Sequence, residues 1–207
     1  AKIRAARALL NWGQKDLAAR SDVSHMAITN LEQGKTEPQT ETIEKICNAF
    51  ELSGVAITEK GVEFREQTVA TIEGDGWYLR LLDDVYHTLM DKPGAEYLTM
   101  CADDKASPAE VNNRLRKIRN AGIRMRQLVQ EDNTHLMGPV AEYRYIPKKQ
   151  FKNNVSLIYG DKVAICIGGA KAVVFKDADL AATWRNIFDV MWNNLEQPKE
   201  STAHERF

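Results

Sequence analysis

Residues 14–38 read QKDLAARSDVSHMAITNLEQGKTEP, and this stretch decides the fold of the N-terminal part of the chain. Apolar residues recur at helical spacing on both sides of a polar break, which predicts two short helices over 14–20 and 24–33. Ser24 is a good N-cap for the second helix, and Gly34 follows its last turn. The pattern is therefore helix, tight turn, helix, with polar residues left on the outer side of the second helix.

Two further helices are predicted around this pair. Residues 3–12 carry apolar side chains at a helical period and end at Gly13, and residues 41–52 place four apolar side chains on one face. Residues 1–52 are thus predicted to form an all-α bundle. Two short helices around a tight turn, the second one polar outside, are typical of a helix-turn-helix.

The 14–38 stretch resembles the phage-repressor-like (XRE-type) helix-turn-helix family. The matching residues stand at the family's spacing without a gap: Gln14, Leu17, Ala18, Val23, Ile28, Leu31, Glu32, Gly34 and Pro38. The resemblance covers about a quarter of the chain. Two departures are small, since Asp22 stands where the family often has Gly, and His25 and Met26 are unusual recognition residues. The resemblance implies binding to double-stranded DNA.

A helix that reads DNA needs polar groups at its exposed N-terminal end, where base edges in the major groove are reached. Asn30 can bond adenine through two hydrogen bonds, His25 can reach a guanine N7 or a phosphate, and Met26 can pack on a thymine methyl group. The resemblance places these three residues on base-contacting positions and Gln14 on a position that contacts phosphate or an adjacent base. The predicted DNA-binding residues are Gln14, Lys15, Ser24, His25, Met26, Thr29, Asn30, Lys35 and Thr36. The competing interpretation is that these are ordinary solvated positions.

Charge and size limit how the chain would bind DNA. The 207 residues contain 28 Lys and Arg against 29 Asp and Glu, so no global field draws the protein to DNA or to an anionic membrane. Residues 1–36 carry a small excess of positive charge, enough to bias binding without dominating it. Because one such module is too small to read a full operator, a homodimer on a pseudo-palindromic site is the expected assembly.

The rest of the chain predicts a second domain. Residues 53–76 are expected to form a β-hairpin over 55–64 followed by a linker, and residues 77–196 alternate strand and helix signals as an α/β module for dimerisation, effector sensing or both. The strand pair 162–167 and 172–175 is predicted to turn at Gly168-Gly169. A long helix follows over 179–195, and the polar tail 197–207 is expected to fray. The predicted fold class is thus multi-domain α+β.

A second, weaker resemblance lies in this module. The run from Tyr159, YGDKVAICIGG, and the closing helix that ends near Trp192 are similar to the C-terminal end of effector domains with a phospholipase-D-like fold. Such domains are found behind helix-turn-helix modules in transcriptional regulators. Phospholipase-D-like enzymes use a His-x-Lys motif followed by an acid, and neither His87 nor His135 has a Lys two positions on. We therefore expect no enzymatic activity.

A cluster of basic residues in the second domain allows three interpretations. The cluster contains no acid and comprises Arg114, Arg116, Lys117, Arg119, Arg124 and Arg126. It can be an anionic effector site centred on Arg124, Arg126 and Arg144, a solvated helix face with a charged edge strand, or an extra contact with the DNA backbone.

The sequence contains no pattern typical of a metal site, a cofactor site or a membrane span. The three cysteines show no metal-ligand spacing, no cofactor motif is found, and no stretch is apolar and long enough to span a bilayer. A cytoplasmic protein without metal or cofactor is expected. Two other function classes stay open: an antitoxin-like or structural partner protein that autoregulates through its helix-turn-helix, and a DNA-directed phosphodiesterase or nuclease.

Overall fold

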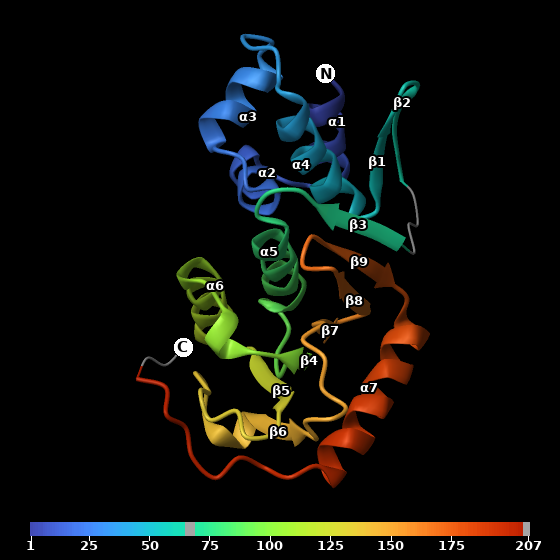
Figure 1. The fold of residues 1–207 in the computed structure, drawn as a ribbon. Helices are drawn as coiled ribbons and strands as arrows, with labels where there is room; N and C mark the ends of the chain where they lie inside the picture. The colour runs from blue at the N-terminus through green and yellow to red at the C-terminus, as the bar shows by residue number, and fades with distance from the viewer. Residues whose placement is uncertain (65–68, 205–207) are drawn as a thin grey trace. The chain divides into compact units, whose positions relative to one another are not determined.

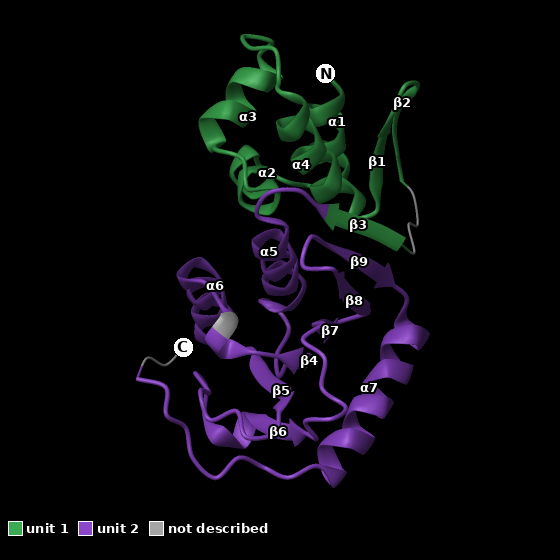
Figure 2. Ribbon diagram, viewed as in Figure 1, with its two compact units in different colours: residues 1–72 green, residues 73–207 purple. Residues whose placement is uncertain are grey.

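The computed structural model describes residues 1–64 and 69–204 and divides the chain into two compact units, 1–72 and 73–207 (Figure 2). Residues 65–68 of the predicted linker and residues 205–207 of the predicted tail lie outside the described residues. Along the described parts, N-terminal helices and a hairpin are followed by an α/β region, so the predicted fold class is confirmed.

The first unit is a bundle of four helices, as the apolar periodicity predicts. The helices are α1 (Lys2–Leu9), α2 (Gln14–Ser21), α3 (His25–Glu32) and α4 (Thr40–Glu51). Each contributes fully buried side chains to one core, among them Ala6, Leu17, Ile28 and Phe50. Trp12 stacks on Phe50 with ring centroids 5.7 Å apart. Such short helices are marginal alone, so this shared core holds them in place.

The turn between α2 and α3 is set by two residues. Asp22 adopts a left-handed conformation with φ of 53°, which Gly adopts without steric cost and other residues adopt less readily. Ser24 caps α3 as predicted, because its hydroxyl accepts a hydrogen bond from the Ala27 amide at 3.2 Å. The pair of helices therefore has the geometry of a helix-turn-helix.

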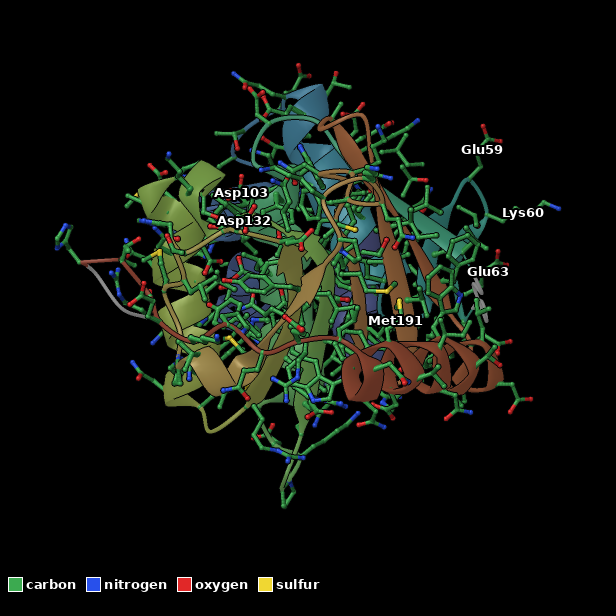
Figure 3. All side chains as sticks on the ribbon, turned by 60° about the horizontal axis from the view of Figure 1, so that its bottom comes forward. Glu59, Lys60, Glu63, Asp103, Asp132 and Met191 are labelled. Carbon is green, nitrogen blue, oxygen red and sulfur yellow. The ribbon has the colours of Figure 1, made fainter. Side chains whose placement is uncertain are left out.

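The predicted hairpin is also present. Strands β1 (Val55–Thr58) and β2 (Gly61–Phe64) pair antiparallel, and Glu59, Lys60 and Glu63 extend away from the hairpin (Figure 3). Lys2 of α1 donates from Nζ to the carbonyl oxygens of Thr58 and Glu59, at 2.9 and 3.0 Å. The expectation of a linker after the hairpin is wrong for residues 69–73, which form strand β3 (Val69–Glu73). Its alternation of Val69, Thr71 and Glu73 with Ala70 and Ile72 is a strand pattern that the nearby glycines obscured.

In its described residues, 73–204, the second unit contains three α-helices, two short 3-10 helices and a mixed sheet. The helices are α5 (Trp77–Leu89), η1 (Asp104–Ala106), α6 (Ala109–Asn120), η2 (Val140–Glu142) and α7 (Ala178–Asn194). The strands are β4 (Glu96–Ala102), β5 (Arg124–Gln130), β6 (Tyr143–Ile146), β7 (Ser156–Tyr159), β8 (Lys162–Ile167) and β9 (Lys171–Lys176).

The strands of this unit lie in the order β9-β8-β7-β4-β5-β6. The β4–β5 and β5–β6 pairs are parallel, and the β4–β7, β7–β8 and β8–β9 pairs are antiparallel. The β8–β9 turn falls at Gly168-Gly169, as predicted, and both glycines have positive φ. The interpretation of β5 as a charged edge strand is wrong, because β5 lies between β4 and β6.

Helices cover both faces of the sheet, with α7 on one side and α5 and α6 on the other (Figure 1). The α7 side is apolar: Leu98, Leu128 and Ile158 are fully buried against Phe188. This packing is one hydrophobic core of the second unit.

The segment after α7 is held in place along its described part. The Ser201 hydroxyl donates to the Leu136 carbonyl at 2.6 Å, and the Thr202 amide donates to the Thr134 carbonyl at 2.8 Å. Ala203 is buried. The expectation of a frayed tail is therefore wrong for these residues, because local polarity does not reveal a docking partner elsewhere in the chain. No helix among the described residues is long and apolar enough to cross a membrane.

Candidate nucleic-acid interface

The outer face of α3 is open at its N-terminal end. Ser24 and His25 are exposed, and Met26, at 74%, is the most exposed large apolar side chain among the described residues. One turn later Ile28 is fully buried, and Leu31 packs against the same core. The helix is thus anchored from behind while its first turn is free to meet a groove.

A polar network ties the two helices of the motif together. The Glu32 carboxylate accepts hydrogen bonds from Arg7 Nε at 2.6 Å, Arg7 Nη2 at 2.9 Å and Gln14 Nε2 at 2.8 Å. Gln14 Oε1 in turn accepts from the Thr29 hydroxyl at 3.1 Å. The hydrogen bonds from Arg7 hold the pKa of Glu32 below its usual range, so the carboxylate stays charged.

In the free protein, this network holds the side chains of Gln14 and Thr29, two of the predicted DNA-binding residues. Gln14 and Thr29 are half-buried, and each bonds within the protein rather than pointing freely outward. Asn30 is half-exposed beside them. These hydrogen bonds hold the polar side chains of both helices in fixed positions. A surface that binds the DNA major groove gains affinity from such preorganisation.

The predicted phosphate contacts lie on the open surface. Lys15 is exposed in the first turn of α2, and Lys35 and Thr36 are exposed just beyond α3. The Lys35 amide donates to the Asn30 carbonyl at 2.9 Å, which fixes the path of the chain after α3. The DNA-contacting roles of all nine residues stay predictions, since no DNA is present.

The structure brings two of the three predicted effector arginines together and gives them other partners. Arg126 makes a two-pronged ion pair with Glu96, at 3.0 and 2.7 Å, and a third bond with Asp189 at 2.8 Å. The guanidinium groups of Arg126 and Arg144 both lie over the Trp192 ring, at 5.2 and 4.3 Å from its centroid. Burial and the neighbouring Arg126 lower the pKa of Arg144.

The other basic residues of the cluster are also engaged. Arg114 pairs with Asp83 at 2.8 Å, and Arg119 donates from Nη1 to Glu142 at 2.8 Å. Arg124 is the most open of the effector candidates, with 69% of its side chain exposed. The anion-site hypothesis stays a prediction, but Arg126 already has carboxylate partners that an anion would have to displace.

Sequence reasoning missed a set of buried polar residues in the second unit. Tyr97 and Thr99 on β4 and Gln127 on β5 are at most 3% exposed and face a cavity of about 240 Å³. The signal lay in the β4 sequence EYLTMCA, where apolar residues alternate with Tyr97 and Thr99 although both faces of the strand are covered. No group of three or more metal-ligating side chains occurs within residues 1–64 and 69–204.

Comparison with known proteins agrees with the first unit. The helix-turn-helix family model matches residues 3–56, which include α1 to α4 and the start of β1. No curated protein matches the chain.

Two solved structures are similar to parts of the chain. One is a phospholipase D family member, Nuc from Salmonella typhimurium, with 14% identity over 64% of this chain and 98% of that one, at a TM-score of 0.46. The other is TrmBL2, an archaeal chromatin protein whose structure shows a mode of DNA binding, with 14% identity over 84% of this chain and 66% of that one, at a TM-score of 0.42. From its sequence match and its geometry, the N-terminal part of the chain is a helix-turn-helix domain of the XRE type, the module of DNA-binding regulators.

Proposed function

We propose that this chain is a transcriptional regulator that binds a pseudo-palindromic operator as a homodimer and represses by occupying the promoter. The observation that carries the proposal is the first turn of α3, where Ser24, His25 and Met26 are exposed while Ile28 is fully buried behind them. Met26 is the most exposed of the large apolar side chains in the described residues, and it shares this turn with polar groups that can meet base edges in a major groove.

Specificity comes from α3 in this proposal. Asn30 bonds adenine, His25 reaches a guanine N7 or a phosphate, and Met26 packs on a thymine methyl group. Gln14 and Thr29 hold the two helices in register, and Gln14 lies close enough to the same surface to meet a phosphate or base at its edge. Lys15, Ser24, Lys35 and Thr36 supply backbone contacts, which position the domain but do not read sequence.

The homodimer follows from the size of the module, and α7 offers a surface for it. Ile187 is 48% exposed and Val190 is 65% exposed on that helix. Exposed apolar residues on one helix favour contact with another copy or with a different protein. Co-purification of a stoichiometric second protein would favour the antitoxin-like alternative.

We also propose that the second unit is not an enzyme. A His-x-Lys motif would need Lys two positions after His87 or His135, and Leu89 and Met137 stand there instead. The Met137 amide is bonded to the Asp104 carboxylate at 2.9 Å, which makes this loop a packed structural element. Hydrolysis of a phosphodiester by the purified chain, lost in His135→Ala, would contradict this.

DNA binding is tested by its salt dependence on a random-sequence duplex. Each lysine that touches a phosphate contributes about one to the slope of log affinity against log salt. We expect Lys15→Gln and Lys35→Gln each to lower the slope by about one. Lys60→Gln is the matched control, because Lys60 extends into solvent from the hairpin turn (Figure 3). A wild-type chain that shows no binding, or equal slopes for all three variants, would overturn the proposed surface.

A further inference from the structure

The two faces of β4 and β5 differ in chemistry although both are covered by helices. Toward α7 the strands present Leu98 and Leu128, both fully buried in an apolar core. Toward α5 and α6 they present Tyr97, Thr99 and Gln127, which are equally buried. Burying polar side chains where apolar ones would pack is costly unless the groups are used. This face therefore calls for an explanation beyond packing.

These side chains line a cavity. It has a volume of about 240 Å³ and lies within the second unit, with walls from α5, α6 and the loop before β7. Thr99 and Gln127 are direct neighbours in the β4–β5 register, so their side chains stand next to each other on its floor. Trp77, Tyr78 and Tyr97 supply aromatic walls. The cavity is smaller than the roughly 300–1,000 Å³ of sites for drug-sized molecules, so its occupant must be small.

The amide donor of Gln127 on this floor is left unbonded by the described residues. Gln127 Nε2 is fully buried and, among the residues that the structure describes, has no hydrogen-bond partner. Buried polar groups are nearly always bonded, to protein or to a bound molecule. An unbonded amide donor on a residue that lines a cavity, next to a hydroxyl, is complementary to a carbonyl or ring-nitrogen acceptor.

The charge of the walls excludes anions. The only charged residues that line the cavity along the described chain are Asp103 and Asp104, and no Lys or Arg lines it. Asp104 is 4% exposed and is held by the Tyr143 hydroxyl at 2.7 Å and the Met137 amide at 2.9 Å. Burial raises the pKa of Tyr78 and Tyr97, so both phenols stay neutral. An anion would lose its hydration here and gain no counter-charge.

We propose that this cavity is a binding site for a small, flat, uncharged molecule that offers a carbonyl or ring-nitrogen acceptor to Gln127 and stacks against Trp77, Tyr78 or Tyr97. The site lies apart from Arg124, Arg126 and Arg144, none of which lines it. As an effector site it deepens the proposed regulatory function and rests on it, but the binding itself is independent of DNA.

The test uses three forms of one ring that differ in charge. Nicotinamide is neutral and bears a carbonyl, nicotinate is its anion, and 1-methylnicotinamide is a cation. Uracil serves as a second neutral, carbonyl-bearing ring. Binding at millimolar concentration to the full chain is measured by saturation-transfer NMR without DNA. We expect at least one of the two neutral rings to bind and nicotinate not to bind.

Variants locate the binding in the cavity. Gln127→Met keeps the shape of the side chain and removes the amide, so we expect affinity for the neutral ring to fall roughly fivefold while the thermal stability is kept or rises. Gln130→Met is the matched control on the same strand, and it does not line the cavity. We expect it to bind as the wild type does.

Several results would overturn the site. If neither nicotinamide nor uracil binds, the cavity holds water only. If nicotinate binds as tightly as nicotinamide, or if only the 1-methylnicotinamide cation binds, the ligand is not of the uncharged class. Equal affinities of Gln127→Met and the wild type would place the binding elsewhere. A failure of the proposed DNA binding leaves all these results unchanged, so the two failures are distinguishable.

Discussion

Arg7 on α1 holds Glu32 at the end of α3 in a two-pronged ion pair, with Nε–Oε1 and Nη2–Oε2 distances of 2.6 and 2.9 Å. Only 1% of the Glu32 side chain and 14% of the Arg7 side chain is exposed. The same carboxylate accepts from Gln14 of α2, so a single group joins three of the four helices. The position of the recognition helix therefore depends on this ion pair.

Replacing Glu32 should destabilise the first unit. Glu32→Gln leaves the Arg7 charge half-buried and unpaired, and breaking such a pair costs about 3 kcal/mol. The free energy of unfolding is measured from urea-dependent hydrogen exchange of residues 1–64 in the full chain. Glu41→Gln is the control, because Glu41 pairs with Lys45 on the surface of α4 and should change stability by less than about 0.5 kcal/mol. Equal effects of the two variants would contradict the role of the ion pair.

The same pair predicts how stability depends on pH. Because Arg7 lowers the pKa of Glu32 in the folded state, the stabilisation is complete above the unfolded value of about 4.3 and is lost as the pH falls through the folded value. The difference in unfolding free energy between wild type and Glu32→Gln should therefore be constant near neutral pH and shrink below about pH 4. Unfolding curves at a series of pH values measure it; a constant difference down to pH 2 would contradict the ion pair.

The left-handed residue in the α2–α3 turn predicts a stabilising change. Asp22 has φ of 53°, a conformation that costs a residue with a Cβ about 1 kcal/mol. Asp22→Gly should raise the unfolding free energy of the first unit by roughly 0.5–1 kcal/mol, and Asp22→Val should lower it. The midpoint of urea unfolding measures both. A less stable Asp22→Gly variant would show that the Asp22 side chain contributes more than its backbone strain costs.

Neighbouring arginines on β5 should differ sharply in their contribution to stability. Arg126→Met leaves Glu96 and Asp189 without their shared partner and removes one of the two guanidinium groups over the Trp192 ring, so we expect a loss of about 2–3 kcal/mol from the second unit. Arg124→Met is the matched control, since Arg124 is 69% exposed and lies 3.9 Å from Glu96; its loss should stay below about 1 kcal/mol. Tryptophan fluorescence during urea unfolding measures the loss, because three of the four tryptophans, Trp77, Trp184 and Trp192, belong to the second unit. Similar losses in both variants would show that the ion pair and the stacking add little.

Asn30 should carry sequence discrimination. Asn30→Ala removes the side chain that bonds adenine, so the preference for the operator over a site with one altered base pair should fall by about 1–3 kcal/mol at that position. Non-specific binding and its salt dependence should not change. Lys35→Gln is the contrasting variant, which should weaken binding to all sequences alike. Anisotropy titrations of operator and altered duplexes separate the two. Unchanged discrimination in Asn30→Ala would remove this residue from the recognition surface.

Much of the fold was predictable because local signals agreed with the tertiary structure. The four N-terminal helices, the cap at Ser24 and the Gly168-Gly169 turn follow from periodicity and from residues with strong backbone preferences. Strand β3 was missed because glycines flank it, and β5 was misjudged because its arginines are typical of an edge. Strand order depends on long-range pairing, which charge along one strand does not encode.

The DNA-binding surface could be predicted from the sequence, but the contacts of Arg126 and the cavity could not. The exposed turn of α3 was predictable, since an amphipathic helix after a tight turn has only one open face. The partners of Arg126 were not, because Glu96 and Asp189 are 30 and 63 positions away in the chain. The cavity was missed for the same reason: Thr99 and Gln127 become neighbours only through the β4–β5 register.

Selecting bound sequences from a random DNA pool with the full-length chain at physiological salt tests the central claim most directly. We predict enrichment of two inverted half-sites whose centres lie about one helical turn, roughly 10 bp, apart. Loss of the enriched motif in Asn30→Ala would assign it to α3. A pool that stays random, or an enriched motif that survives Asn30→Ala and His25→Ala together, would contradict the claim that this chain is an operator-binding regulator that reads DNA through α3.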